Sequence, residues 1–214
     1  MLPFTYCGPV PSSGDAAVSL RIGLVSDTHI PEAMDHLWPQ VYEAFDGVDY
    51  IFHGGDIHEF WVLDTLEKLA PVYAARGNGE DGSGGRPVQP DDPRVREAWS
   101  FEMENLTVGL THYIPTEERP PYLTVARWVE RYFPDRRPDV IVYGDTHTEA
   151  IEVVDGILCV NPGSPTYPHN YDTQYGTIGF LDLDDGNADA SVWLITDGGI
   201  EAFDWDEVPP WRQR

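Results

Sequence analysis

The sequence is poor in basic residues. Of its 214 residues, 13 are Lys or Arg and 37 are Asp or Glu, so the formal net charge is −24, and Lys68 is the single lysine. Nucleic acids and anionic membrane surfaces are bound mainly through clusters of Lys and Arg. We therefore expect no binding to duplex nucleic acid and no membrane association, and the excess of acidic residues favours solubility.

Long apolar runs and closely spaced cysteines are also missing. No stretch approaches the roughly 18 apolar residues that a membrane-spanning helix needs. The opening "MLPFTYCGPVPSSGDAAVSL" lacks a basic segment followed by an apolar core, so we expect no signal peptide. The two cysteines, Cys7 and Cys159, lie far apart and match no disulfide framework or metal-ligand spacing. These features predict a cytoplasmic protein in which Cys159 is a small buried residue.

The chain length suits one domain. The Pro, Gly and Ser content of residues 1–20 predicts a flexible N-terminal arm, and residues 21–214 are expected to form a single domain without internal repeats. Short apolar runs predict strands at 21–27, 48–56 and 71–78. The spacing of apolar residues predicts helices at 34–45 and 60–70. A strand–helix–strand–helix–strand order is typical of an α/β fold with a parallel sheet region.

The second half is expected to be rich in strands. Residues 79–97 are dominated by Gly and Pro and predict a long exposed loop. Hairpins are predicted in 98–113 around Glu104 and Asn105, in 150–164 around Asp155 and Gly156, and in 176–195 around "DDGN". A helix is expected at 122–133 and a buried strand at 139–145, and Trp and Pro in the tail are expected to cap the fold. We expect two packed sheets flanked by helices.

Polar side chains that can bind metals follow five of the predicted strands. They are Asp27 and His29, Asp56, Asn78, His112, and Asp145 and His147. In open α/β sheets ligands bind beyond the carboxyl ends of the strands, so we expect these five turns to converge. Each motif alone also fits an ordinary turn or a buried strand histidine, but their repetition at five strand ends favours one shared site.

Imidazole, carboxylate and amide groups are ligands for divalent ions. Residues two apart in an extended segment point the same way, so Asp27 and His29 are expected to bind one ion together, as are Asp145 and His147. The ligands suffice for two ions about 3.5–4 Å apart that share one carboxylate. Such a pair stabilises the attacking and leaving oxygens of an in-line phosphoryl displacement.

The series "SDTH…HGGD…RGN…LTH…GDTH…NPGS" resembles the calcineurin-like metallophosphoesterases, in particular the small prokaryotic phosphodiesterase branch that also contains the retromer scaffold subunit. The resemblance covers residues 21 to about 195. It implies a four-layer α/β/β/α sandwich of two mixed sheets flanked by helices. It also implies a first ion bound by Asp27, His29, Asp56 and His147. A second ion would be bound by Asp56, Asn78, His112 and a further histidine, with Asp56 bridging the two.

One departure from this pattern concerns the second ion. The family usually has Gly-His-x-His where this chain has Gly144, Asp145, Thr146 and His147. We expect Asp145 to bind the second ion through oxygen, a harder ligand that favours manganese, magnesium or ferrous iron. Manganese is the expected ion; iron, nickel, zinc and magnesium are alternatives. A second site that fills only at high metal concentration is the other interpretation.

A second departure follows Asn78, where many family members have a histidine that protonates the leaving group and this chain has Gly79. His58 and His169 are candidate substitutes, although a packing or exposed role is favoured for both. Glu80 and Asp81 are expected to face solvent, and Arg86 is a weak candidate for a phosphate contact. The turn "NPGS" at 161–164 is either purely structural or supports the metal loops or an anion.

The sequence therefore predicts a divalent-metal-dependent phosphodiesterase or phosphatase acting on a small phosphate ester. Its dinuclear centre would provide a bridging hydroxide for in-line attack, with Asp56, Asn78 and His112 as catalytic residues and His112 neutralising developing charge. The alternative is a catalytically weak protein of the same fold that acts as a protein-interaction scaffold. A serine acyl hydrolase is disfavoured because no G-x-S-x-G motif is present.

Overall fold

A computed structural model describes residues 20–114, 124–170 and 175–205 of the chain. The predicted N-terminal arm lies outside the described residues except for Leu20, and so does the tail from residue 206 onward. Among the described residues, no helix has the length and apolar character needed to cross a bilayer.

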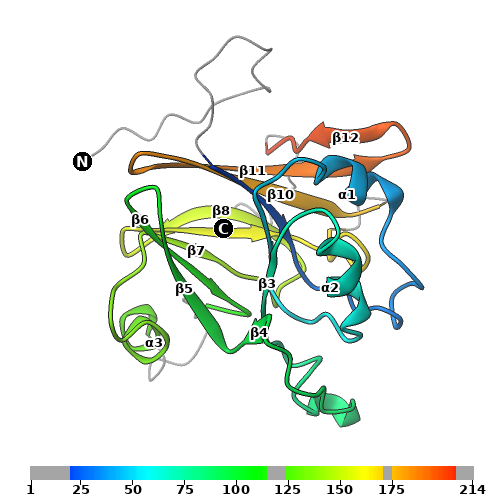
Figure 1. Cartoon of the computed structure of the whole chain (residues 1–214), viewed down its shortest axis with the longest axis horizontal. Coiled ribbons are helices and arrows are strands. Elements are labelled where there is room, and N and C mark those ends of the chain that lie inside the picture. The colour runs from blue at the N-terminus through cyan, green and yellow to red at the C-terminus, as the bar shows by residue number, and fades with distance from the viewer. Residues whose placement is uncertain (1–19, 115–123, 171–174, 206–214) are drawn as a thin grey trace.

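The strands form two mixed sheets (Figure 1). The seven-stranded sheet has the order β12-β11-β10-β1-β2-β3-β4, and the five-stranded sheet has the order β5-β6-β7-β9-β8. The strands are β1 (Leu20–Val25), β2 (Tyr50–His53), β3 (Val72–Ala75), β4 (Val95–Arg96), β5 (Ala98–Met103), β6 (Leu106–Thr111), β7 (Val140–Val142), β8 (Glu149–Val154), β9 (Ile157–Pro162), β10 (Thr177–Asp184), β11 (Asn187–Thr196) and β12 (Gly199–Ala202).

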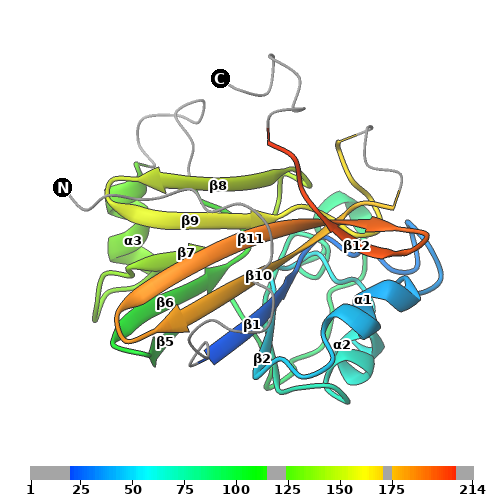
Figure 2. The same cartoon turned by 90° about the horizontal axis from the view of Figure 1, so that it is seen from above.

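Helices cover the outer face of each sheet (Figure 2). Helices α1 (Pro39–Ala44) and α2 (Trp61–Leu66) pack on the seven-stranded sheet, and α3 (Val125–Tyr132) packs on the five-stranded sheet. Apolar side chains fill three interfaces: between α1, α2 and the first sheet, between the two sheets, and between the second sheet and α3. The predicted four-layer α/β/β/α sandwich is therefore confirmed.

The period-two alternation of strand side chains explains how each sheet serves two cores. In β1, Ile22 and Leu24 point into the core between the sheets, whereas Val25 faces the helices. In β7, Val142 points between the sheets and Ile141 points toward α3. These strands are apolar on both faces because both faces are buried, as is typical of strands covered by helices.

The predicted hairpins are confirmed, and their turns have the expected backbone. Glu104 and Asn105 join β5 to β6 with φ of 46° and 61°, and Asp155 and Gly156 join β8 to β9 with φ of 51° and 80°. A positive φ at both central residues is the requirement of a type I′ turn, whose twist matches that of the paired strands.

The predicted helix at 34–45 is wrong at its start, because α1 begins at Pro39. Proline fits the first position of a helix, where its missing N–H is not needed, but it disfavours helical geometry in the preceding residue. Trp38 accordingly has an extended ψ of 140°. The helices predicted at 60–70 and 122–133 are also shorter in the structure, and residues 122–123 lie outside the described part.

The loop predicted at 79–97 is more ordered than expected. It contains a short 3₁₀ turn, η1 (Ser83–Gly85), and ends in β4, which extends the first sheet by pairing in parallel with β3. Glu80 is fully buried, so the prediction that it faces solvent is wrong. Its backbone also pairs with that of Gln89, whose N–H donates to the Glu80 carbonyl at 2.9 Å.

Replacing Phe52 by alanine tests the core between the sheets. The Phe52 side chain is fully buried and stacks on Phe101 with a centroid separation of 4.9 Å. We expect Phe52→Ala to lower the free energy of unfolding by about 3–5 kcal/mol, as for other buried aromatic truncations. The exposed Val153→Ala is the control, expected to change stability by less than about 0.5 kcal/mol in urea denaturation. Equal losses in the two variants would contradict the assigned layers.

Candidate metal centre

The seven predicted ligand residues lie together beyond the ends of five strands. β1, β2 and β3 pair in parallel in the first sheet, and β6 pairs in parallel with β7 in the second. Their carboxyl ends therefore open toward the same region, and the segments that follow are linked by backbone hydrogen bonds. Asp27 N–H donates to the Gly55 carbonyl at 2.9 Å, and Gly144 N–H donates to the His112 carbonyl at 2.8 Å.

The backbone of the Asp-x-His segments is not extended, so the geometry predicted for them is wrong. Asp27 and His29 have φ of 52° and 45°, and Asp145 and His147 have φ of 70° and 55°. Left-handed conformations cost roughly 1–2 kcal/mol per non-glycine residue, least for Asp, and are concentrated at functional sites. The two side chains of each segment converge on the site through tight left-handed turns rather than through strand periodicity.

The first cluster consists of Asp27, His29, Asp56 and His147. One ligand atom from each residue lies within 4.8 Å of those of the other three, and all four residues are buried. His29 Nε2 lies 3.3 Å from Asp56 Oδ2, and His147 Nε2 lies 3.6 Å from Asp27 Oδ1. These are the four residues expected to bind the first ion.

The second cluster surrounds His112 Nε2. This atom lies 3.2 Å from Asn78 Oδ1, 3.3 Å from Asp56 Oδ1 and 3.7 Å from Asp145 Oδ1. Ligands bonded to one ion at about 2.1 Å are separated from their neighbours by about 3.0–3.4 Å. Asn78 and Asp56 lie near this spacing from His112 Nε2, whereas Asp145 is slightly farther away. Asp56 joins the two clusters because its Oδ1 faces His112 and its Oδ2 faces His29.

Two histidines are oriented by hydrogen bonds from their second ring nitrogen. His112 Nδ1 lies 2.9 Å from the Gly54 carbonyl, and His147 Nδ1 lies 2.7 Å from the Tyr167 carbonyl. Because a carbonyl oxygen only accepts, Nδ1 must carry the proton in both rings. In the neutral tautomer each Nε2 then has a lone pair directed at the cluster, as metal-binding histidines require.

Burial and the clustering of charge shift several pKa values. Burial raises the pKa of Asp27 to about 7, against the opposing effects of His112 and the Ser26 hydrogen bond. Burial lowers the pKa of His147 to about 4, which favours the neutral ligand form. Burial also opposes charge on His112, but Asp27 and Asp56 outweigh it and raise its pKa. The carboxylates of this centre are thus buried beside imidazoles, and a divalent cation would neutralise their negative charge.

His29 Nε2 supports the same conclusion, because it is buried and its 3.3 Å contact with Asp56 Oδ2 does not have hydrogen-bond geometry. A buried polar atom without a hydrogen bond is costly, and a metal ion satisfies it. Asp56 is anchored for the bridging role by the Gly79 N–H, which donates to Oδ1 at 2.7 Å. Burial alone would raise the pKa of Asp56, but contacts with His29, His112 and Gly79 hold it well below its usual range.

Glu80 is a supporting residue that the sequence did not reveal. Its Oε1 accepts hydrogen bonds from the N–H groups of Ile57 and His58 at 2.7 and 2.9 Å. Its Oε2 accepts from Gly77 N–H at 2.7 Å. One carboxylate therefore joins the loop that carries Asp56 to the loop that carries Asn78.

His53 is also structural. Gly55 N–H donates to its Nδ1 at 3.1 Å, and its Nε2 lies 3.1 Å from Thr28 Oγ1. Since Nδ1 accepts, the proton of the neutral ring is on Nε2 and is donated to Thr28. Burial lowers the pKa of His53 to about 3, so the ring is neutral and holds the first two loops together.

The "NPGS" turn supports the metal loops, one of the interpretations left open by the sequence. Asn161 Nδ2 donates to the Gly144 carbonyl at 2.8 Å, and Ser164 Oγ donates to the Asp27 carbonyl at 2.7 Å. Gly163 has a φ of 76°, and a Cβ there would lie 2.2 Å from Thr177 Oγ1. The turn thus holds the segments that contain Asp27 and Asp145 in place.

The remaining candidates lie at the edge of the centre. His58 is buried, and its ring occupies the space beside Gly79, where a Cβ would stand 2.7 Å from His58 Nε2. His169 is exposed and stacks on His147 with a centroid separation of 4.3 Å. Arg86 pairs with Glu32 through two contacts of 3.3 Å. Cys159 is buried as predicted, and burial raises the pKa of its thiol to about 12.

A four-layer sandwich with carboxylates, imidazoles and an amide at its strand ends defines a metallophosphoesterase. The calcineurin-like phosphoesterase superfamily domain matches residues 20–186, and the chain belongs to this family. A probable metallophosphoesterase of Methanothermobacter thermautotrophicus is 34% identical over 81% of this chain and 91% of the relative. A phosphodiesterase of Methanocaldococcus jannaschii is 30% identical over 77% of this chain and 94% of the relative.

Solved structures show the same fold. Vps29 of Cryptosporidium parvum aligns with a TM-score of 0.66 and 20% identity over 86% of this chain and 95% of its own. A structure described as a novel archaeal phosphodiesterase aligns with a TM-score of 0.53 and 25% identity, covering 81% of this chain and 99% of its own. The relatives support a phosphoesterase of the hydrolase class.

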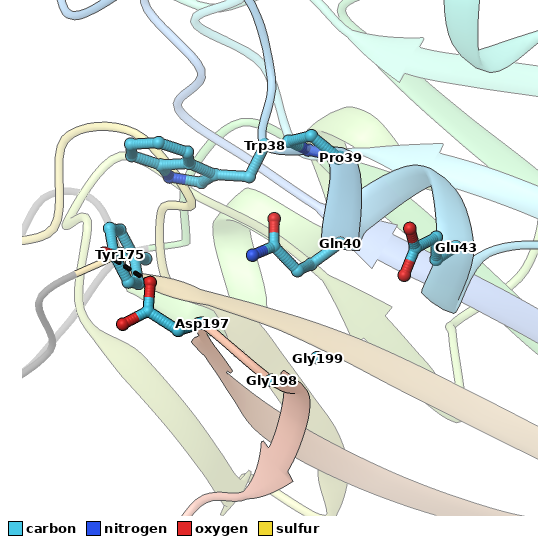
Figure 3. Close-up of a pocket in the computed structure, with 8 residues that line it drawn as sticks. All are labelled: Trp38, Pro39, Gln40, Glu43, Tyr175, Asp197, Gly198 and Gly199. Carbon is cyan, nitrogen blue, oxygen red and sulfur yellow. Dashed lines mark hydrogen bonds between the residues drawn. The ribbon is translucent and has the colours of Figure 1, made fainter.

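A surface pocket lies outside this centre, between α1 and the β11–β12 turn (Figure 3). Trp38 and Tyr175 form one end, and the carboxylates of Glu43 and Asp197 also line it. Tyr175 donates to Asp197 Oδ1 at 2.8 Å. None of the seven ligand residues lines this pocket, so it is not part of the candidate metal centre.

Replacing Glu80 by glutamine tests the bridge between the two metal loops. The amide nitrogen of glutamine would face backbone N–H donors, so at least one buried hydrogen bond is lost. We expect Glu80→Gln to reduce the free energy of unfolding by roughly 1–3 kcal/mol in urea denaturation. The exposed Glu59→Gln is the matched control and should leave stability unchanged. A Glu80→Gln protein as stable as this control would show that the bridge is unimportant.

Proposed function

We propose that this chain is a divalent-metal-dependent phosphodiesterase with a dinuclear centre. The observation that supports the proposal best is the position of Asp56, whose two carboxylate oxygens face separate clusters of ligands. When bound, the two ions would supply a hydroxide nucleophile at neutral pH and stabilise charge on the phosphoryl oxygens during in-line attack. Manganese is the ion that we propose for the centre.

The residues of the chain would bind and orient. Asp27, His29 and His147 hold the first position together with Asp56, and Asn78, His112 and Asp145 hold the second. Hydrogen bonds to the Gly54 and Tyr167 carbonyls direct Nε2 of His112 and His147 inward, so these two imidazoles are oriented before an ion arrives. We propose a small phosphate ester as substrate, consistent with a relative named a phosphodiesterase.

Asp145 is proposed as a ligand of the second ion in place of the usual family histidine. Its Oδ1 lies 3.7 Å from His112 Nε2, and 22% of its side chain is exposed. The exposed edge leaves room for the small shift that ligation requires. A carboxylate at this position adds negative charge and favours oxygen-preferring ions.

The scaffold alternative, in which the fold recruits a protein and holds little metal, has no specific support in the described residues. The similarity to Vps29 is at 20% identity and concerns the fold alone. Metal content decides between the two functions. Less than about half an equivalent of manganese after incubation and desalting would favour the scaffold, on the principle that a tight site retains its ion.

The Asp56→Asn variant tests the proposed function. The substitution conserves shape but removes the shared charge, so hydrolysis of an activated phosphodiester with Mn²⁺ should fall at least about 100-fold, or about 2.7 kcal/mol of transition-state stabilisation. Asp135→Asn is the control and should keep full activity, because Asp135 is exposed and is not one of the seven candidate ligand residues. Equal rates for wild type and Asp56→Asn would refute the proposal.

The Asp145→Ala variant tests the ligand assignment at the second position. We expect the wild type to bind two Mn²⁺ ions with different affinities. In the variant, the more weakly bound ion should lose affinity at least about tenfold, whereas the affinity of the more tightly bound ion should not change. Asp145→His restores the family residue and should shift preference from Mn²⁺ toward Zn²⁺. Isothermal titration calorimetry measures both; unchanged binding of both equivalents by Asp145→Ala would mean that Asp145 is not a ligand.

A further inference from the structure

The chain contains a third Asp-x-His segment, Asp56-Ile57-His58, and the seven-residue centre uses only its aspartate. All three segments have the same backbone: φ is positive at Asp27, His29, Asp56, His58, Asp145 and His147. In the segments that contain Asp27 and Asp145, the histidine Nε2 faces a carboxylate of the centre. His58 is the histidine of this set that the proposed function does not use.

His58 lies in the environment of a ligand. Only 7% of its side chain is exposed, and its ring centroid lies 4.4 Å from that of His29. The Nε2 atom of His58 is buried and makes no hydrogen bond. Gly79 allows this arrangement, because a Cβ at this position would collide with the His58 ring, 2.4 Å from Cδ2.

Glu32 completes a third group of ligands. Its Oε2 lies 3.8 Å from His58 Nδ1, and one ligand atom each of His29, Glu32 and His58 lies within 4.8 Å of the other two. Two imidazoles and one glutamate are a known zinc-binding set with an open fourth position. Neighbouring ligands of tetrahedral zinc are about 3.4 Å apart, so separations in the group must contract by up to about 1.4 Å from the 4.8 Å limit. Glu32 can make this movement because 53% of its side chain is exposed.

We propose that His29, Glu32 and His58 form an auxiliary site for a zinc-like cation beside the centre that contains Asp56. The site shares the His29 imidazole with the first cluster and adds two residues that the phosphodiesterase mechanism does not require. This binding claim does not depend on the proposed hydrolysis, because a cation can occupy the group in a protein of either function.

Arg86 competes with a cation for Glu32, so substitutions of Arg86 and of Glu32 are expected to have opposite effects on zinc binding. Its Nε and Nη2 each lie 3.3 Å from an oxygen of Glu32. The guanidinium therefore binds the carboxylate oxygens that would otherwise be available to the cation. It also places a positive charge next to the site. Removing Arg86 should therefore strengthen zinc binding, whereas removing Glu32 or His58 should weaken it. If Glu32 served only to anchor the Arg86 loop, the Arg86 and Glu32 variants would instead behave alike.

The experiment titrates the full-length, metal-free protein with Zn²⁺ in a calorimeter. Glu32→Gln and His58→Gln should each weaken one component of the zinc isotherm at least about tenfold, as expected for loss of a ligand. Arg86→Gln should tighten the same component. His36→Gln and Glu59→Gln, at exposed positions, are matched controls and should reproduce the wild-type isotherm.

Isotherms of Glu32→Gln and His58→Gln that superimpose on the wild type would overturn the proposal, and so would a weakening by Arg86→Gln. Circular dichroism checks folding, and the exposed Glu32 keeps the test valid if His58→Gln does not fold. The two proposals can be refuted separately. A protein that shows this zinc component but no hydrolysis would refute only the proposed phosphodiesterase activity. A protein that hydrolyses phosphodiesters but lacks this component would refute only the auxiliary site.

Discussion

The carboxylate of Asp56 is the group on which the candidate centre depends. Its two oxygens face different clusters, and it receives a backbone hydrogen bond from Gly79 that fixes its orientation. Two buried carboxylates, Asp27 and Asp56, lie among imidazoles in the same region. Burying these charges together is unfavourable unless a cation compensates them, which is why the arrangement is best explained by metal binding.

The fold supplies the rigidity that this arrangement needs. Parallel strands from two sheets bring five loops to one edge, and the loops are then joined by supports that contain no ligand. Glu80 connects the second and third loops, His53 connects the first and second, and Ser164 fixes the carbonyl of Asp27. The left-handed residues of the Asp-x-His segments are stable because these contacts over-determine their backbone.

The sequence predicted the hairpins and the convergence of the seven candidate ligand residues, because turn chemistry and strand-end residues are local signals. The four-layer order followed from the family resemblance. It failed where the cause is not local. Glu80 has the character of a loop residue, but its partners are backbone N–H groups, two of them more than twenty positions earlier. The left-handed turns of Asp27 and His29 have no signature in the letters. The late start of α1 is the exception, because its cause is local: Pro39 limits the backbone of Trp38, and the spacing of apolar residues does not show this.

The most direct test of the account is anomalous X-ray scattering from crystals of the manganese-loaded protein. Two anomalous peaks about 3.5–4 Å apart, with Asp56 between them, are the result expected of a dinuclear centre. A single peak, or manganese bound away from Asp56, would contradict the central claim that this carboxylate is shared by two ions.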